Sequence, residues 1–196
     1  QRTHIVHMMR MAEEPMKYLG IPDTGTIRSP VVSSSARKGE GSRNGSFFSR
    51  LLLYRVDQTE PFAQVDLGSL TVLDMDFDEG VVWLVGEDRL LTVTLDKERE
   101  SVQTYYITPN YLKGCSLGGD GFALLLVGRY RSGGATQALR VNSSAQVVAS
   151  IPLTGQVLDY AAAGSFSALL TGSRLSLYNG SMEQFAELEN NQGARK

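Results

Sequence analysis

The sequence is poor in the residues that most often build catalytic and metal centres. It has one cysteine, Cys115, and two histidines, His4 and His7. A single cysteine can form neither an internal disulfide bond nor a zinc site made of cysteines. Both histidines lie ahead of the repeats described below, which excludes from those repeats a Ser-His-Asp triad and a histidine metal centre. The sequence therefore predicts no catalytic residues, no metal ligands and no cofactor, and Cys115, between apolar neighbours, is interpreted as a buried strand thiol.

The sequence also has no large excess of charge of one sign and no long apolar run. Lys and Arg number 19 against 21 for Asp and Glu, so no basic surface for nucleic acid or an anionic membrane is expected. No run approaches the roughly 18 apolar residues of a membrane span. Because position 1 is Gln rather than Met, we expect a truncated sequence, with any signal or anchor upstream.

Short apolar runs separated by glycine-rich turns make up most of the chain. Three units, 72–107, 112–153 and 157–189, each hold four strand-like runs in the same order, with turn residues at matching places. Their starts lie 40 and 45 residues apart. Four strands on such a period are typical of β-propeller blades. A single β-sandwich is the alternative, although a sandwich gives no reason for a recurring four-strand unit.

The predicted fold is therefore all-β, a partial β-propeller of about three and a half four-stranded antiparallel blades. Residues 46–67 supply the outer two strands of a preceding blade, and 192–196 start a further one. The N-terminal segment 1–45 is predicted to be irregular, with a flexible Gly/Ser-rich loop over 33–45. Since a propeller closes with about four to eight blades, either 1–45 completes a small ring or, as we favour, the chain is a fragment. Open sheet edges would then promote self-association.

Three stretches carry a resemblance to a known family: VLDMDFDEGVVWLVGEDRLLTV (72–93), ALLLVGRYRSG (123–133) and LTGSRLSLYNGSMEQFAELENNQGARK (170–196). Residues 46–196 resemble the C-terminal half of a bacterial propeller family of unknown function, similar to WD40-type and quinoprotein-type propellers. The resemblance implies attachment by one N-terminal membrane helix, with the propeller outside the cell. That helix is not in this sequence, so the localisation of this chain stays open.

Two further motifs are interpreted as structural. Asp74, Asp76 and Asp78 imitate the start of a calcium loop, but the sixth position is Glu79 and the twelfth Val85, which fails the EF-hand pattern. Asn-x-Ser triplets begin at positions 44, 142 and 179 and match a glycosylation pattern. At strand junctions we interpret them as hairpin turns.

One rim of the predicted propeller gathers arginine and tyrosine. The loops between second and third strands (86–89, 128–135, 172–174) lie on the same rim as the connections between blades (108–112, 152–156). Arginine pairs with carboxylates and tyrosine gives rigid contact area, so this rim is the predicted binding surface for an acidic partner, either a protein or a cell-surface polymer. The predicted binding residues are Arg89, Tyr111, Arg129, Tyr130, Arg131 and Arg174.

The leading hypothesis is a non-enzymatic recognition or scaffold module, part of a membrane-anchored surface protein. The alternative is a propeller enzyme or cofactor-binding domain whose site lies on blades missing from this chain. The full-length gene would discriminate them, since clustered His, Asp or Glu at first-strand ends would favour the enzyme.

Overall fold

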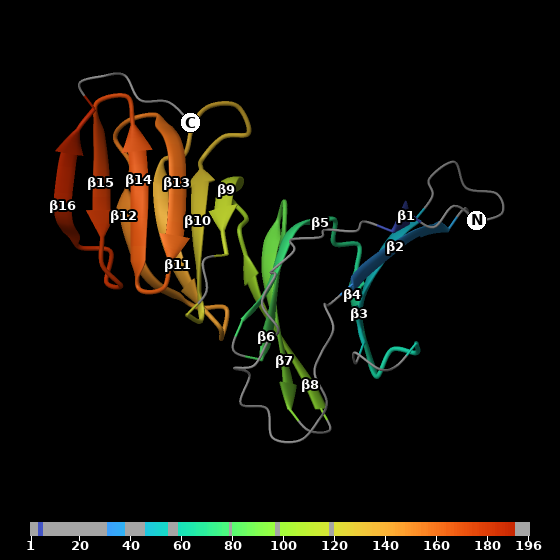
Figure 1. The fold of residues 1–196 in the computed structure, drawn as a ribbon. Coiled ribbons are helices and arrows are strands. Elements are labelled where there is room, and N and C mark those ends of the chain that lie inside the picture. Colours follow the sequence, from blue (N-terminus) through green and yellow to red (C-terminus); the bar gives the residue numbers. More distant parts are fainter. Residues whose placement is uncertain are drawn as a thin grey trace. The chain divides into compact units, whose positions relative to one another are not determined.

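Strands make up the regular structure of the chain (Figure 1). The computed structural model describes residues 4–5, 31–37, 46–54, 59–78, 80–96, 99–117 and 120–190. These residues form 16 strands and no helix. The strands make four antiparallel sheets of four strands, and in each sheet neighbours in sequence are neighbours in space. The chain divides into two compact units, 1–72 and 73–196.

The first unit holds one sheet. Its strands are β1 (His4–Ile5), β2 (Val31–Arg37), β3 (Ser46–Leu53) and β4 (Ala63–Gly68). Strand β2 pairs with β3 from Val31–Leu52 to Arg37–Ser46, so the prediction of a flexible loop over 33–45 is wrong for 33–37. The sequence predicts only the outer two strands of a blade over 46–67. Together with β1 and β2, these strands form a complete sheet of four. The prediction of an irregular segment over 1–45 is likewise wrong for 4–5 and 31–37, which form strands. The predictions for 1–3, 6–30, 38–45 and 192–196 lie outside the described residues.

The second unit holds three sheets in succession. The first consists of β5 (Val72–Asp78), β6 (Val81–Gly86), β7 (Arg89–Asp96) and β8 (Arg99–Tyr106). The second consists of β9 (Tyr111–Ser116), β10 (Phe122–Gly128), β11 (Gln137–Asn142) and β12 (Val147–Pro152). The third consists of β13 (Val157–Ala163), β14 (Phe166–Thr171), β15 (Arg174–Tyr178) and β16 (Gln184–Glu189). These bounds lie within a few residues of the predicted strands.

The middle sheet, β9–β12, packs through both of its faces. Leu125 and Val127 join a core with Trp83 of the preceding sheet, while Leu124 and Leu126 join a core with Leu169 of the following sheet. In a sandwich, each sheet buries one face and turns the other to solvent. Sheets stacked through both faces are blades, so the β-sandwich alternative is wrong and the fold is a partial β-propeller.

Successive blades of the second unit are joined along their first strands. The Gly121 amide donates to Asp78 Oδ2 at 2.8 Å across the first interface. Across the second interface, the Ala162 amide donates to Ser116 Oγ at 3.0 Å. The Cys115 amide donates to the Tyr160 hydroxyl at 3.2 Å. These bonds lie at or next to the first strands of the blades, and they fix the inner ends of the interfaces.

A buried arginine fastens the last two blades. Arg140 on β11 is 2% exposed, and its guanidinium donates to the carbonyl oxygens of Gly164 and Ser165 at 3.3 and 3.2 Å. The guanidinium also lies 4.0 Å from the centre of the Phe122 ring, a cation–π contact. Burial lowers the pKa of Arg140, and the charge of Asp120 opposes that shift. Gly164 has φ +57, and an added Cβ would meet the Asp120 carboxylate, so glycine is required there.

The Asn-x-Ser triplets at 142 and 179 are turns, as predicted. The Asn142 side-chain oxygen accepts hydrogen bonds from the amides of Ser144 and Gln146. The Asn179 side chain does the same for Ser181 and Glu183. Each asparagine thereby closes the hairpin between the third and fourth strands of its blade.

One face of the last blade carries exposed apolar side chains. The rings of Phe166 and Phe185 contact edge to face with centroids 5.7 Å apart, and they are 57% and 55% exposed. The register places Leu170, Leu175 and Leu188 together on that face, opposite to Leu169, and Leu188 is 68% exposed. Exposed apolar clusters of this kind favour association.

We expect the Arg140→Met variant to unfold more easily by about 1–3 kcal/mol, because two partly buried carbonyl oxygens lose their donor. Urea unfolding followed by the fluorescence of Trp83 measures the change. Arg131→Met, at an exposed arginine, is the matched control and should change the free energy of unfolding by less than about 0.5 kcal/mol. Equal destabilisation of both variants would contradict this role of Arg140.

We expect the isolated chain to self-associate as its concentration rises, and the Phe166→Ser/Phe185→Ser double variant to associate less, because it removes the aromatic part of the exposed face. Sedimentation velocity over a concentration series measures this. Tyr130→Ser is the control, since Tyr130 is 73% exposed on a loop. A wild-type chain that stays monomeric throughout the series would disprove the expectation.

Candidate functional site

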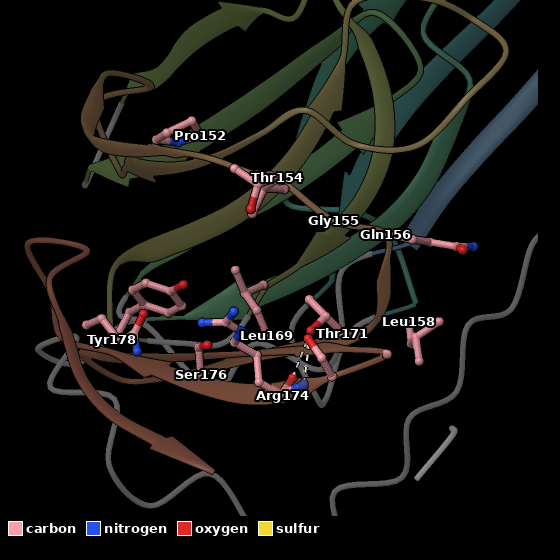
Figure 2. A pocket seen from close by; sticks show the side chains of 14 residues that line it. Pro152, Thr154, Gly155, Gln156, Leu158, Leu169, Thr171, Arg174, Ser176 and Tyr178 are labelled. Atoms are coloured by element: carbon pink, nitrogen blue, oxygen red, sulfur yellow. Dashed lines mark hydrogen bonds between the residues drawn. The ribbon is translucent and has the colours of Figure 1, made fainter. Parts of the chain in front are cut away.

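An open groove lies between the last two blades, on the rim predicted to bind (Figure 2). Its volume is about 670 Å³, within the usual range of ligand sites. One wall is the connection 152–156, which leads from β12 to β13. The other side chains that line this inter-blade groove come from the last blade and include Leu158, Leu169, Thr171, Arg174, Ser176, Tyr178 and Gln184.

The floor of the inter-blade groove follows from the alternation of β15. Side chains two apart on a strand point to the same face, so Arg174, Ser176 and Tyr178 face the groove together. Ser176 pairs in register with Leu169 of β14, which adds an apolar side chain beside the serine. Figure 2 shows these residues of the floor opposite the connection that carries Thr154 and Gly155.

The connection 152–156 is held by the blade that precedes it. The Leu153 amide donates to the carbonyl oxygen of Thr136 at 2.9 Å, just after the predicted binding loop 128–135. That loop is itself anchored, because Lys113 Nζ donates to the carbonyl oxygen of Arg131 at 2.8 Å. The wall of the groove and the loop are thus parts of one rim.

A charged pair lies at the floor. Arg174 Nη1 contacts both carboxylate oxygens of Glu187 at 3.2 Å. Gln184 Nε2 donates to the same carboxylate at 2.6 Å. The hydrogen bond from Gln184 and the contact with Arg174 lower the pKa of Glu187, so this carboxylate is ionised at neutral pH. The two charges cancel locally.

The six predicted binding residues fall into three groups. Arg174 lies in the inter-blade groove. Arg129, Tyr130 and Arg131 lie on the exposed loop after β10, and Arg131 reaches Glu87 of the neighbouring loop at 3.7 Å. The remaining two lie at strand starts, where Arg89 is mostly buried and Tyr111 is 42% exposed.

Three of the four arginines predicted on the rim lie near carboxylates of the chain. Arg89 lies 3.7 Å from Asp88, Arg131 the same distance from Glu87, and Arg174 contacts Glu187. Each of these three guanidinium groups has a carboxylate of the chain within salt-bridge distance. The structure therefore gives no support to an acidic polymer as partner.

Sequence reasoning missed Ser176, Tyr178 and Gln184 as groove residues. A signal was available, since RLSLY (174–178) alternates polar and apolar residues. Alternation alone does not say whether a polar face meets solvent or a neighbouring blade, and only the stacking of blades makes this face a groove.

A second cluster lies on the first strands. Cys115 is half-buried against the apolar core, where its thiol donates to Asp74 Oδ2 at 3.9 Å. Burial, with the charge and hydrogen bond of Asp74, raises the pKa of the thiol to about 11. Within the described ranges no group of three His, Cys, Asp or Glu side chains could hold a metal ion. In the same residues, no helix is long and apolar enough to cross a membrane.

No protein-family model and no curated protein matches the sequence. Among solved structures, the chain is similar to BBS1N, crystallised in complex with ARL6DN, with 10% identity and a TM-score of 0.49 over 84% of this chain and 53% of that one. It is similar to BamB from Moraxella catarrhalis with 13% identity and a TM-score of 0.40 over 78% and 47%. It is similar to Hsv2 from Kluyvelomyces marxianus with 12% identity and a TM-score of 0.40 over 62% and 40%.

These three proteins are β-propellers, the fold that the stacked sheets define for this chain. The chain spans between 40% and 53% of their lengths. At such low identity the likeness concerns the fold alone, so the function has to be argued from the rim and its groove.

We expect Cys115 to react slowly with iodoacetamide at pH 8, because a raised pKa leaves little of the reactive thiolate. The Asp74→Asn variant should react several-fold faster, since it removes a charge that raises the pKa of Cys115. Asp159→Asn is the control, an aspartate on β13 that bonds the Tyr160 amide. Alkylation of the wild type as fast as free cysteine would show that Asp74 and burial do not act in this way.

Proposed function

We propose that the chain is part of a non-enzymatic β-propeller that recognises a protein partner, and that the partner binds in the inter-blade groove. The observation that carries the proposal is the groove itself, about 670 Å³ on the rim where the loops of three blades meet by topology. Propellers present such rims on a rigid support, because each blade is held by its neighbours.

The chemistry of the groove supports a polypeptide as ligand. Apolar side chains such as Leu158 and Leu169 line it together with the hydroxyl groups of Thr171, Ser176 and Tyr178. A mixed surface of this kind suits a chain that alternates peptide groups and side chains. The loop 128–135, which ends beside Thr136 at the groove's wall, carries the exposed Tyr130, and exposed tyrosine gives contact area at low entropic cost.

The alternative, an enzyme or cofactor-binding domain with its site on other blades, is supported by no residue of this groove. Membrane attachment outside a bacterial cell stays a prediction that depends on the family resemblance. The full-length gene tests it, through the presence of an apolar helix ahead of position 1.

We expect immobilised wild-type protein to enrich specific sequences from a display library of random linear peptides, and the Gly155→Trp variant to lose their binding. Gly155 lines the groove, has ordinary backbone geometry, and an added Cβ there meets nothing within 4 Å. The indole would therefore fill the groove without backbone strain. Fluorescence polarisation with the enriched peptides measures the affinity.

The matched control is Gly134→Trp. Gly134 also has ordinary backbone geometry and open space for a Cβ, but it lies on the loop 128–135, outside the groove's lining. Loss of binding in Gly155→Trp alone supports the groove. Loss in Gly134→Trp alone would move the binding site to the loop, and failure to enrich any peptide would refute the proposal.

A further inference from the structure

We propose that the inter-blade groove binds an uncharged, extended stretch of polypeptide, with the Ser176 hydroxyl and the unpaired side of the Arg174 guanidinium holding the peptide main chain. The inference rests on the proposed function and specifies the chemistry of the ligand. Three observations carry it: a serine hydroxyl that faces the groove and has no hydrogen-bond partner among the described residues, an arginine whose charge is already paired, and the remaining donors of that arginine.

Ser176 is the first observation. Its side chain lines the groove although the residue is only 5% exposed, and within the described part of the chain no hydrogen bond to its hydroxyl is found. Among the described residues, the hydroxyl oxygen is not one of the side-chain atoms that are both fully buried and without a partner, so it is accessible from the groove, where it can donate and accept hydrogen bonds. A ligand in the groove that brings a carbonyl oxygen or an amide would supply the missing partner.

The charge of the groove is the second observation. Among the described residues, Arg174 is the one charged residue that lines the groove, and Glu187 holds its Nη1 at 3.2 Å. An anionic ligand would compete with Glu187, whose carboxylate also accepts from Gln184. A neutral ligand leaves this network intact, which favours a peptide main chain over an acidic side chain or a phosphate.

The third observation is the other edge of the guanidinium. Arg174 Nη2 and Nε have no hydrogen-bond acceptor among the described residues, while Figure 2 shows the guanidinium lying toward Ser176. Both are donors, and peptide carbonyl oxygens are acceptors. Since Arg174, Ser176 and Tyr178 repeat along β15 at every second residue, an extended peptide lying along the strand can meet them in succession.

The experiment uses the peptides that the wild-type chain selects from the random library. Their affinity for the wild type should change less than about twofold between about 50 mM and about 500 mM NaCl, because no net charge is neutralised on binding. Ser176→Ala should weaken binding about five- to tenfold, the loss of one hydrogen bond. Ser167→Ala removes another buried serine hydroxyl, on β14 outside the groove's lining, and should leave the affinity unchanged.

The outcomes separate this inference from the proposed function. Peptides that Gly155→Trp excludes, but whose affinity falls steeply with salt, would keep the groove and overturn the neutral ligand. Unchanged affinity in Ser176→Ala, or equal losses in both serine variants, would overturn the role of Ser176. Binding that Gly155→Trp leaves intact would instead refute the proposed function.

Discussion

The stacking of one four-stranded sheet on the next is the constraint on which the second unit depends. A sheet such as β9–β12 has apolar side chains on both faces, so it can be buried only between two other sheets. Hydrogen bonds at or next to the first strands, from Gly121 to Asp78 and from Ala162 to Ser116, fix where the sheets meet. The inter-blade groove lies where the connection 152–156 passes over β15 of the next blade.

Polar groups in these interfaces determine which contacts are specific. Thr92 on β7 is fully buried and donates to the Ser143 carbonyl oxygen of the next blade at 2.7 Å. Arg140 stands at the corresponding place on β11 and reaches the carbonyl oxygens of the blade that follows. In each blade, the third strand pairs with the second strand at equivalent positions: Thr92 with Trp83, Arg140 with Leu124, and Leu177 with Ala168. Leu177 is therefore the residue of β15 at this position. The exposed face of the last blade thus lacks the donor that the two inner interfaces share.

The strands of the second unit could be predicted because their signals are local. Alternation over five to eight residues and turns such as Asn142–Ser144 are readable without knowing what packs where. Strand β2 could not be predicted in this way, since its polar run resembles a loop and becomes a strand through pairing with β3, from Val31–Leu52 to Arg37–Ser46. The topology of a propeller was enough to predict this rim and the position of Arg174 on it. The groove was missed because it depends on the separation of two sheets, and the pairing of Arg131 with Glu87 depends on the approach of two loops.

The reach of Arg140 into the next blade has a consequence for synthesis of the chain. The ribosome completes β9–β12 before it makes the turn at Gly164 and Ser165, so for that interval the guanidinium has no carbonyl oxygens to meet. Until Leu169 is made, Leu124 and Leu126 on the same face stay exposed. The blade β9–β12 therefore cannot reach its final packing while it is the newest blade, and maturation of each blade lags emergence of its strands by about one repeat. A nascent chain stalled between these two blades would expose an apolar face together with an unpaired guanidinium, a combination that chaperones and proteases could recognise.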